Sequence, residues 1–131
     1  MKIGVCFLSQ RQNWKTPKKF YEELNKEFHF DFDPCYTGGV TWDNSGLSVD
    51  WKQSNFVNPP YSDIARWMKK AYFEHKKGKT VVMLVPSRTD TKWWHDFVMM
   101  ADEIRFIKGR IHFDERGPAP FPSAIVVFRA K

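Results

Sequence analysis

The chain has 131 residues with a formal net charge of +6, and 42% of its residues are hydrophobic and 17% aromatic. This length suits one compact domain with a sizeable core, here residues 1–131, and leaves no room for a second. Two cysteines are too few for a disulfide framework, and the four histidines stand singly, without metal-ligand spacing. No apolar run reaches the length of a membrane span. We therefore expect a cytoplasmic protein with reduced thiols, no metal and no membrane partner, whose oligomeric state the sequence leaves open.

Positive charge is concentrated in the second half of the chain. Residues 1–63 hold seven basic and eight acidic side chains, whereas residues 64–131 hold fourteen and seven. This asymmetry points toward a polyanion such as nucleic acid, because Lys and Arg bind phosphates regardless of sequence. A basic surface that serves only solubility is the alternative on charge alone.

The first predicted element is a helix over residues 17–28. Thr16 is a typical N-cap, and Pro17 suits the first helical position. Apolar residues then recur every four positions, at Phe20, Leu24 and Phe28.

Three strands are predicted in the middle of the chain. Residues 29–33 alternate in polarity as a strand does, and residues 54–57 are a second short strand. Residues 80–85 are continuously apolar between Gly78 and Pro86, which predicts a strand covered on both faces.

A helix connects the second and third of these strands. Ser62 suits its N-cap, and Lys77-Gly78 has the character of a C-terminus. One helical face is apolar, with Ile64, Trp67, Met68, Ala71 and Tyr72. Strand, helix and strand in this order imply a parallel pair.

The C-terminal third predicts one more helix and several strands. The helix begins at Thr91 and carries Trp94, Phe97, Val98 and Ala101 on one face. Strand-like segments follow at residues 103–107, 110–113 and 124–129, around turns at Gly109 and Gly117-Pro118. We expect an α/β sheet that ends in an antiparallel C-terminal hairpin.

Polar residues follow two of the predicted strands. Asp33 follows the strand over residues 29–33, and Asn58 follows the strand over residues 54–57. Open α/β sheets bind ligands beyond the carboxyl ends of their strands. If these two strands are neighbours, Asp33 and Asn58 face a shared crevice.

Several segments resemble a known enzyme family. Asn58-Pro59-Pro60-Tyr61 resembles motif IV of the amino-methyltransferases, which move a methyl group from S-adenosylmethionine to an exocyclic or amide nitrogen. Residues 13–17, 30–35, 85–95 and 119–124 extend the likeness. Together these segments resemble the phage and prophage DNA N-6-adenine methyltransferases of the Dam type, over about residues 12 to 130.

The resemblance implies a fold, a cofactor and a set of site residues. The fold would be Rossmann-like but abbreviated, because residues 36–53 are too few for a full helix, strand and helix. The implied cofactor is S-adenosylmethionine, and the implied partner is double-stranded DNA. Cofactor residues in this interpretation are Trp14, Thr16, Pro17, Asp33, Pro34 and Cys35, and catalytic residues are Asn58, Pro59, Pro60 and Tyr61. Arg88 would lie near the target pocket, while Lys108, Arg110 and Arg116 of the C-terminal hairpin would hold DNA phosphates.

The chemistry explains these residue types. An adenine amino group is a poor nucleophile, and two acceptors that polarise its N–H bonds would help; the Asn58 Oδ1 and the Pro59 carbonyl oxygen suit that role. Prolines hold the acceptors rigidly, and the Tyr61 ring can stack on the base. The sulfonium is already an activated donor, so no catalytic His or Cys is required.

Alternatives remain at each step. The methylated nitrogen could instead belong to a protein glutamine, an RNA guanine or cytosine N4, and a non-catalytic nucleic-acid-binding module of the same fold is a further possibility. Asp50 could accept the cofactor's adenine amino group or be a solvated loop residue. Asp33 could be a turn residue, and Arg110 and Arg116 could be ordinary surface charges.

Overall fold

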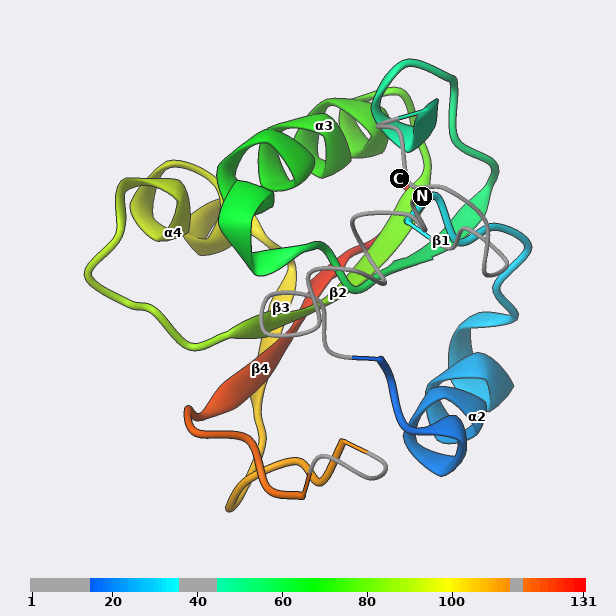
Figure 1. Cartoon of the computed structure of the whole chain (residues 1–131). Coiled ribbons are helices and arrows are strands. Elements are labelled where there is room, and N and C mark those ends of the chain that lie inside the picture. Colours follow the sequence, from blue (N-terminus) through cyan, green and yellow to red (C-terminus); the bar gives the residue numbers. More distant parts are fainter. Residues whose placement is uncertain (1–14, 36–44, 114–116) are drawn as a thin grey trace.

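The computed structural model describes residues 15–35, 45–113 and 117–131. Within these ranges the helices are α2 (Lys18–Phe28), α3 (Ile64–Lys76) and α4 (Lys92–Asp96). The strands are β1 (Ser54–Val57), β2 (Thr80–Pro86), β3 (Glu103–Phe106) and β4 (Ser123–Phe128), as Figure 1 shows. The expected α/β class is therefore confirmed.

The four strands form one mixed sheet in the order β1-β2-β4-β3. β1 and β2 are parallel, with Val57 opposite Met83, which confirms the predicted parallel pair. β4 lies between β2 and β3 and is antiparallel to both. The expected antiparallel C-terminal pair is thus present, and its last strand is inserted into the sheet.

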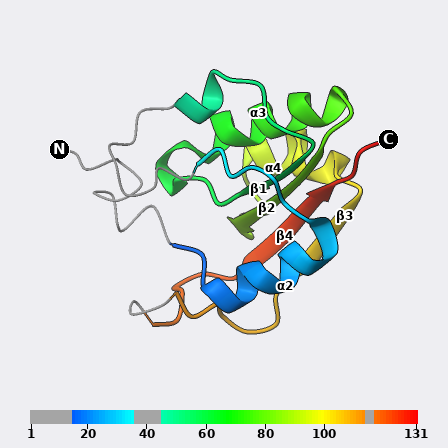
Figure 2. The ribbon, with the colours of Figure 1, turned by 90° about the vertical axis from the view of Figure 1, so that its right-hand side faces the viewer.

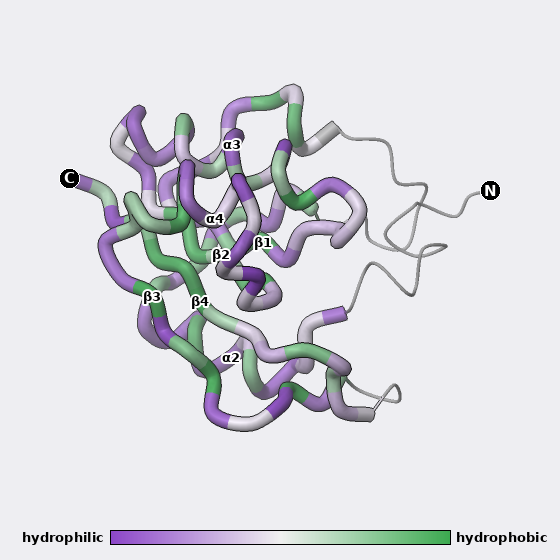
Figure 3. Tube along the Cα trace, turned by 90° about the vertical axis from the view of Figure 1, so that its left-hand side faces the viewer, coloured by the Kyte–Doolittle hydropathy of each residue, from purple (hydrophilic) through white to green (hydrophobic). Residues whose placement is uncertain are grey.

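The sheet is covered on both faces, by α3 and α4 on one side and by α2 on the other (Figures 1 and 2). Side chains of β2 alternate between the two cores: Val81, Met83 and Val85 face α3, whereas Val82 and Leu84 face α2. This double burial explains the continuous apolar run predicted to be a covered strand. Figure 3 shows the hydrophobic residues concentrated along the central strands.

The helix after Asn-Pro-Pro-Tyr buries its predicted apolar face. Trp67, Met68 and Ala71 are completely buried against the sheet. The expected cap at Ser62 is wrong, because residues Tyr61–Asp63 form a 3₁₀ turn and Asp63 occupies the N-cap position without a side-chain cap bond. The helix is held by its buried face instead of by a cap.

The helix that begins after Thr91 is shorter than predicted. The Thr91 hydroxyl accepts a hydrogen bond from the Trp94 amide at 3.2 Å, so Thr91 is the N-cap and the predicted start of the helix is confirmed. α4 ends at Asp96, because Phe97 leaves helical geometry with φ −125° and ψ −46°. A 3₁₀ turn over Val98–Met100 follows. A 3₁₀ turn has fewer residues per turn than an α-helix but still buries one apolar side chain here, Val98. The apolar pattern therefore did not distinguish this turn from a continued helix.

The strand predicted over residues 29–33 is reduced to one parallel bridge, between Phe32 and Asn55. α2 extends to Phe28, and His29 caps its end in the left-handed region with φ 51°. The Asp31 carboxylate accepts a hydrogen bond from the Ser54 amide at 3.0 Å. This side-chain bond stands in place of one backbone hydrogen bond between the two segments. Residues 29–33 nevertheless lie beside β1, as the shared crevice requires.

The strand predicted over residues 110–113 is likewise reduced to one antiparallel bridge, between His112 and Pro118. The Phe113 amide donates to the Gly117 carbonyl at 3.0 Å, closing a small hairpin. Phe113 itself is completely buried on the α2 side of the sheet. The hairpin is therefore anchored to the core through an aromatic side chain.

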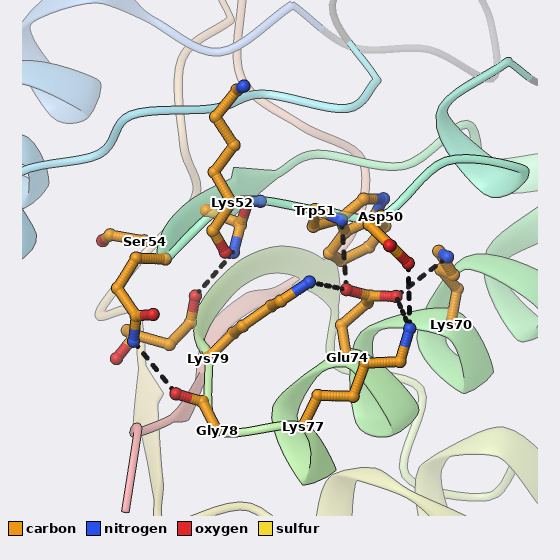
Figure 4. A network of polar contacts seen from close by, with 12 residues as sticks. Asp50, Trp51, Lys52, Ser54, Lys70, Glu74, Lys77, Gly78 and Lys79 are labelled. Atoms are coloured by element: carbon orange, nitrogen blue, oxygen red, sulfur yellow. Dashed lines mark hydrogen bonds and ion pairs between the residues drawn. The ribbon is translucent and has the colours of Figure 1, made fainter.

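A buried carboxylate ties α3 to the segment that precedes β1 (Figure 4). Glu74, with a side chain 1% exposed, accepts the Trp51 amide at 3.0 Å and also pairs with three lysines. Those contacts are Lys70 at 2.9 Å, Lys77 at 3.0 Å and Lys79 at 2.6 Å. Burial raises the pKa of Glu74, but these hydrogen bonds more than offset it and hold the pKa at about 2. The basic end of α3 is thus partly a structural ion cluster.

Candidate functional site

The Asn58-Pro59-Pro60-Tyr61 segment leaves the carboxyl end of β1 and turns into α3. Asn58 is 8% exposed, and both prolines are buried. Pro60 is extended, with φ −64° and ψ 136°, and the 3₁₀ turn begins at the next residue. The Asn58 Nδ2 donates to the Thr16 Oγ1 at 2.9 Å. A predicted catalytic residue and a predicted cofactor residue are therefore in direct contact.

Tyr61 packs between the two cores at this edge. Its ring lies edge-on to Phe121, with centroids 5.1 Å apart. Its hydroxyl is buried and has no hydrogen-bond partner within the described residues. Burial raises the pKa of Tyr61, and the nearby charge of Arg88 opposes this only in part. The phenol therefore stays neutral in the physiological pH range and cannot act as a base there.

Two further loops converge on the same edge. The Ser87 amide, after β2, donates to the Pro122 carbonyl at 2.9 Å, just before β4. Phe121 lies next to that carbonyl in the chain and touches Tyr61. Sequence reasoning did not assign Phe121 to the site. The available signal was its place in segment 119–124, which carried part of the family resemblance.

The Asp33-Pro34-Cys35 segment follows the bridge at Phe32 and so lies beside the end of β1. The Cys35 amide donates to the Asp33 Oδ1 at 3.2 Å, which makes a tight turn, and Cys35 is buried. Burial, and secondly the negative charge of Asp33, raise the pKa of Tyr21 on α2. The Asp33 carboxylate is therefore near the first turns of α2.

A glycine contact shapes the same segment. A methyl group at Gly46 would overlap the Pro34 carbonyl oxygen and crowd the Trp67 ring. The Trp51 Nε1 donates to the Gly46 carbonyl at 2.7 Å and holds this approach in place. The turn at residues 33–35 therefore packs against the backbone of residue 46 so closely that only glycine fits there.

Asp50 lies apart from the other candidate cofactor residues. Its side chain is 81% exposed and pairs with Lys77 at 3.0 Å, and the hydrogen bond from Lys77 lowers the pKa of Asp50. Lys77 precedes the start of β2, whereas Asn58 follows the end of the parallel β1. At ~3.3 Å per residue, the length of the strand separates its two ends by about 13 Å. The structure does not bring Asp50 to the edge that carries Asn58.

The predicted DNA-binding residues are distributed over two loops. Arg88 follows β2 and is close enough to affect Tyr61 electrostatically, while Lys108 is exposed after β3. The Arg110 Nη1 donates to the Ala119 carbonyl at 3.3 Å across the small hairpin. Trp14 and Arg116 lie outside the described residues.

Two structural findings concern other classes of site. Within residues 15–35, 45–113 and 117–131, no three His, Cys, Asp or Glu side chains cluster so as to hold a metal ion. None of the helices in the described part of the chain is long and apolar enough to cross a membrane.

An Asn-Pro-Pro-Tyr segment at the carboxyl edge of parallel strands is the arrangement expected of an amino-methyltransferase. The sequence matches the DNA N-6-adenine-methyltransferase (Dam) family over residues 6–120, and the chain belongs to this family. It is also 29% identical over 141 residues to the DNA N-6-adenine-methyltransferase of Haemophilus phage HP1 (strain HP1c1). That alignment covers 94% of this chain and 82% of the phage protein. No solved structure matches the chain.

Family membership confirms the resemblance inferred from the sequence. The enzyme is an adenine-specific DNA methyltransferase, and its reaction is methylation of adenine N6 in DNA. This decides against the alternatives of glutamine, guanine or cytosine as the methylated group, and against a non-catalytic module.

Proposed function

We propose that adenine N6 is methylated at the carboxyl edge of β1, with Asn58, Pro59, Pro60 and Tyr61 as the catalytic segment. The observation that carries this proposal is the contact of Asn58 with Thr16, which joins the catalytic segment to the predicted cofactor segment at 2.9 Å. The convergence of Tyr61 with Phe121 supports it, because it adds an aromatic wall next to the same segment. Aromatic rings are the surfaces on which extruded bases stack.

The residues around Asn58 suit S-adenosylmethionine. The Thr16 hydroxyl and the Asp33 carboxylate lie on the two segments that flank β1, and they offer polar groups to the amino and hydroxyl groups of such a cofactor. Pro17, Pro34 and Cys35 shape the backbone around them. The cofactor supplies a methyl group already activated by its sulfonium charge. This placement agrees with a Rossmann-like arrangement, in which ligands bind beyond the carboxyl ends of parallel strands.

The catalytic segment positions and polarises the target amino group. The Asn58 side-chain oxygen and the Pro59 carbonyl oxygen accept hydrogen bonds from its two N–H groups. These bonds draw the nitrogen lone pair out of conjugation with the ring. The prolines fix φ, so the acceptors need not reorganise during transfer. Tyr61 is neutral and takes no proton, and the product nitrogen loses its extra proton after transfer. Alignment of nitrogen, methyl carbon and sulfur then supplies most of the rate.

DNA is held by basic residues on the loops beside the catalytic segment. A base inside a duplex must be extruded to reach this edge, at a cost of a few kcal/mol. Arg88 is close enough to Tyr61 to affect it electrostatically, and Lys108 and Arg110 follow β3, so these three can contact phosphates on either side of the extruded base. Arg116 lies outside the described residues and is assigned the same role from the sequence alone. The surplus of positive charge in residues 64–131 supports this assignment.

Cofactor binding tests the placement of the site. Asp33→Ala should weaken binding of S-adenosylmethionine, measured by calorimetry, without a matching loss of melting temperature. Asp50→Ala is the control, because Asp50 is an exposed aspartate near the opposite end of β1 from Asn58. An affinity lost in the Asp50 variant and kept in the Asp33 variant would place the cofactor at the other edge and overturn the proposal.

A further inference from the structure

The contact between Thr16 and Asn58 joins two residues that are 42 positions apart in the chain. Asn58 is buried, and Thr16 is half-buried at the start of the segment that leads into α2. The Thr16 Oγ1 accepts from the Asn58 Nδ2 at 2.9 Å, which is good hydrogen-bond geometry for two side chains. In this bond the Nδ2 end of the Asn58 amide faces Thr16, and the Oδ1 end is turned away from it.

Thr16 does not cap α2, although its sequence context predicts that it would. Pro17 occupies the N-cap position with φ −60° and ψ 137°, and no side-chain cap bond forms there. The first helical backbone bond runs from the Tyr21 amide to the Pro17 carbonyl, at 3.0 Å. The threonine hydroxyl is therefore directed to Asn58 at the expense of a local stabilising bond, and local rules are most often broken at functional sites.

We infer that Thr16 is a positioning residue that fixes the orientation of the Asn58 side-chain amide. An asparagine amide has a donor branch and an acceptor branch of almost the same shape, and rotation by a half-turn exchanges them. A target amino group offers only N–H donors to this side chain, so only the acceptor branch can polarise it. In the structure the bond to Thr16 engages the donor branch, and while this bond holds the amide in place the acceptor branch is the one that can face the base. This inference rests on the proposed catalytic role of Asn58.

The proposal predicts different effects for two substitutions of Thr16. Thr16→Val keeps the shape but removes the hydroxyl, so the Asn58 side chain loses the bond that holds it in this orientation. Thr16→Ser keeps the hydroxyl and should rescue the enzyme. A hydrogen bond of ordinary strength corresponds to a loss of about tenfold in the methyl-transfer rate for the Val variant.

The experiment is a double-mutant cycle in the full chain. Methyl-transfer rates at saturating S-adenosylmethionine are measured for the parent, Thr16→Val, Thr16→Ser, Asn58→Ala and the Thr16→Val/Asn58→Ala double variant. Calorimetry gives the cofactor affinity of each, and thermal unfolding confirms that each is folded. We expect Thr16→Val to lower the rate in the parent and to cost nothing further in the Asn58→Ala background. Because Thr16 also lies in the proposed cofactor segment, rates are compared only at saturating S-adenosylmethionine, so a change in cofactor affinity does not enter the cycle.

Three results would overturn the inference. An equal loss in both backgrounds would make Thr16 a general structural residue. Weaker cofactor binding with an unchanged saturated rate would make Thr16 a cofactor contact only. Asn58→Ala with the parental rate would reject the catalytic role of Asn58, and hence the proposed function itself, which distinguishes that failure from the other two.

Discussion

Glu74→Gln removes the charge of the buried carboxylate while keeping its shape, and we expect it to destabilise the fold strongly. The pKa of Glu74 is lowered from 4.5 to about 2 by the lysines and the Trp51 amide that contact it. Because each pKa unit corresponds to about 1.4 kcal/mol, the ionised form contributes about 3 kcal/mol at neutral pH. The same magnitude is typical when one partner of a buried ion cluster is removed.

The assay is reversible unfolding in urea, followed between pH 7 and pH 3. A carboxylate with a lowered folded-state pKa stabilises the fold fully above its unfolded-state pKa of 4.5, and this contribution is lost as the pH falls toward about 2. The difference in unfolding free energy between the parent and Glu74→Gln should therefore be large at pH 7. It should shrink steadily below pH 4.5.

Glu23→Gln is the matched control, because Glu23 is exposed and, within the described part of the chain, pairs with Lys26 alone, at 3.4 Å. An exposed pair of this kind is worth about 0.5 kcal/mol or less. If Glu74→Gln were no more destabilising than Glu23→Gln, or if its effect did not change between pH 7 and pH 3, the ion cluster would not hold α3 to the segment before β1.

Three further predictions concern the site. Tyr61→Phe should retain methyl transfer in a rate assay, because the lost hydroxyl has no hydrogen-bond partner in the described ranges, whereas Tyr61→Ala should weaken DNA binding; equal losses would show that the hydroxyl matters. Gly46→Ala should lower both the melting temperature and the cofactor affinity, because the added methyl overlaps the Pro34 carbonyl, and a parental affinity would separate this turn from the cofactor. Arg110→Ala should weaken binding to all DNA sequences alike and reduce the salt dependence by about one unit of slope in fluorescence titrations. Lys26→Ala, at the far end of α2, is its charge-matched control, and identical slopes would remove the hairpin from the DNA interface.

The elements predicted best from sequence are those fixed by burial. The run over residues 80–85 has a single physical explanation, a strand with a core on each face, and β2 has that environment. α3 was similarly determined by the side chains that face the sheet, among them Trp67 and Ala71. The order of strands was not readable, because the insertion of β4 between β2 and β3 depends on contacts between distant segments.

The incorrect predictions of local structure concern side chains that bond a residue far along the chain instead of a neighbour. Thr16 was expected to cap α2 but bonds Asn58, and no pattern within one helix reveals a partner so far along the chain. The Ser54 amide donates to the Asp31 carboxylate instead of to a backbone carbonyl, and the segment has a single bridge to β1. The proposed catalytic segment could be singled out from the sequence because its four residues are contiguous. Phe121, which joins them only through the fold, could not.

Transfer of labelled methyl groups from S-adenosylmethionine to unmethylated DNA, followed by digestion to nucleosides, tests the central claim most directly. The parent enzyme should place the label on N6-methyldeoxyadenosine. Asn58→Ala should lower that rate by about 100-fold while cofactor binding persists, because the lost oxygen acts mainly as the amino group develops charge. Label on another base, or an Asn58→Ala rate equal to that of the parent, would contradict the assignment of this edge as the active site.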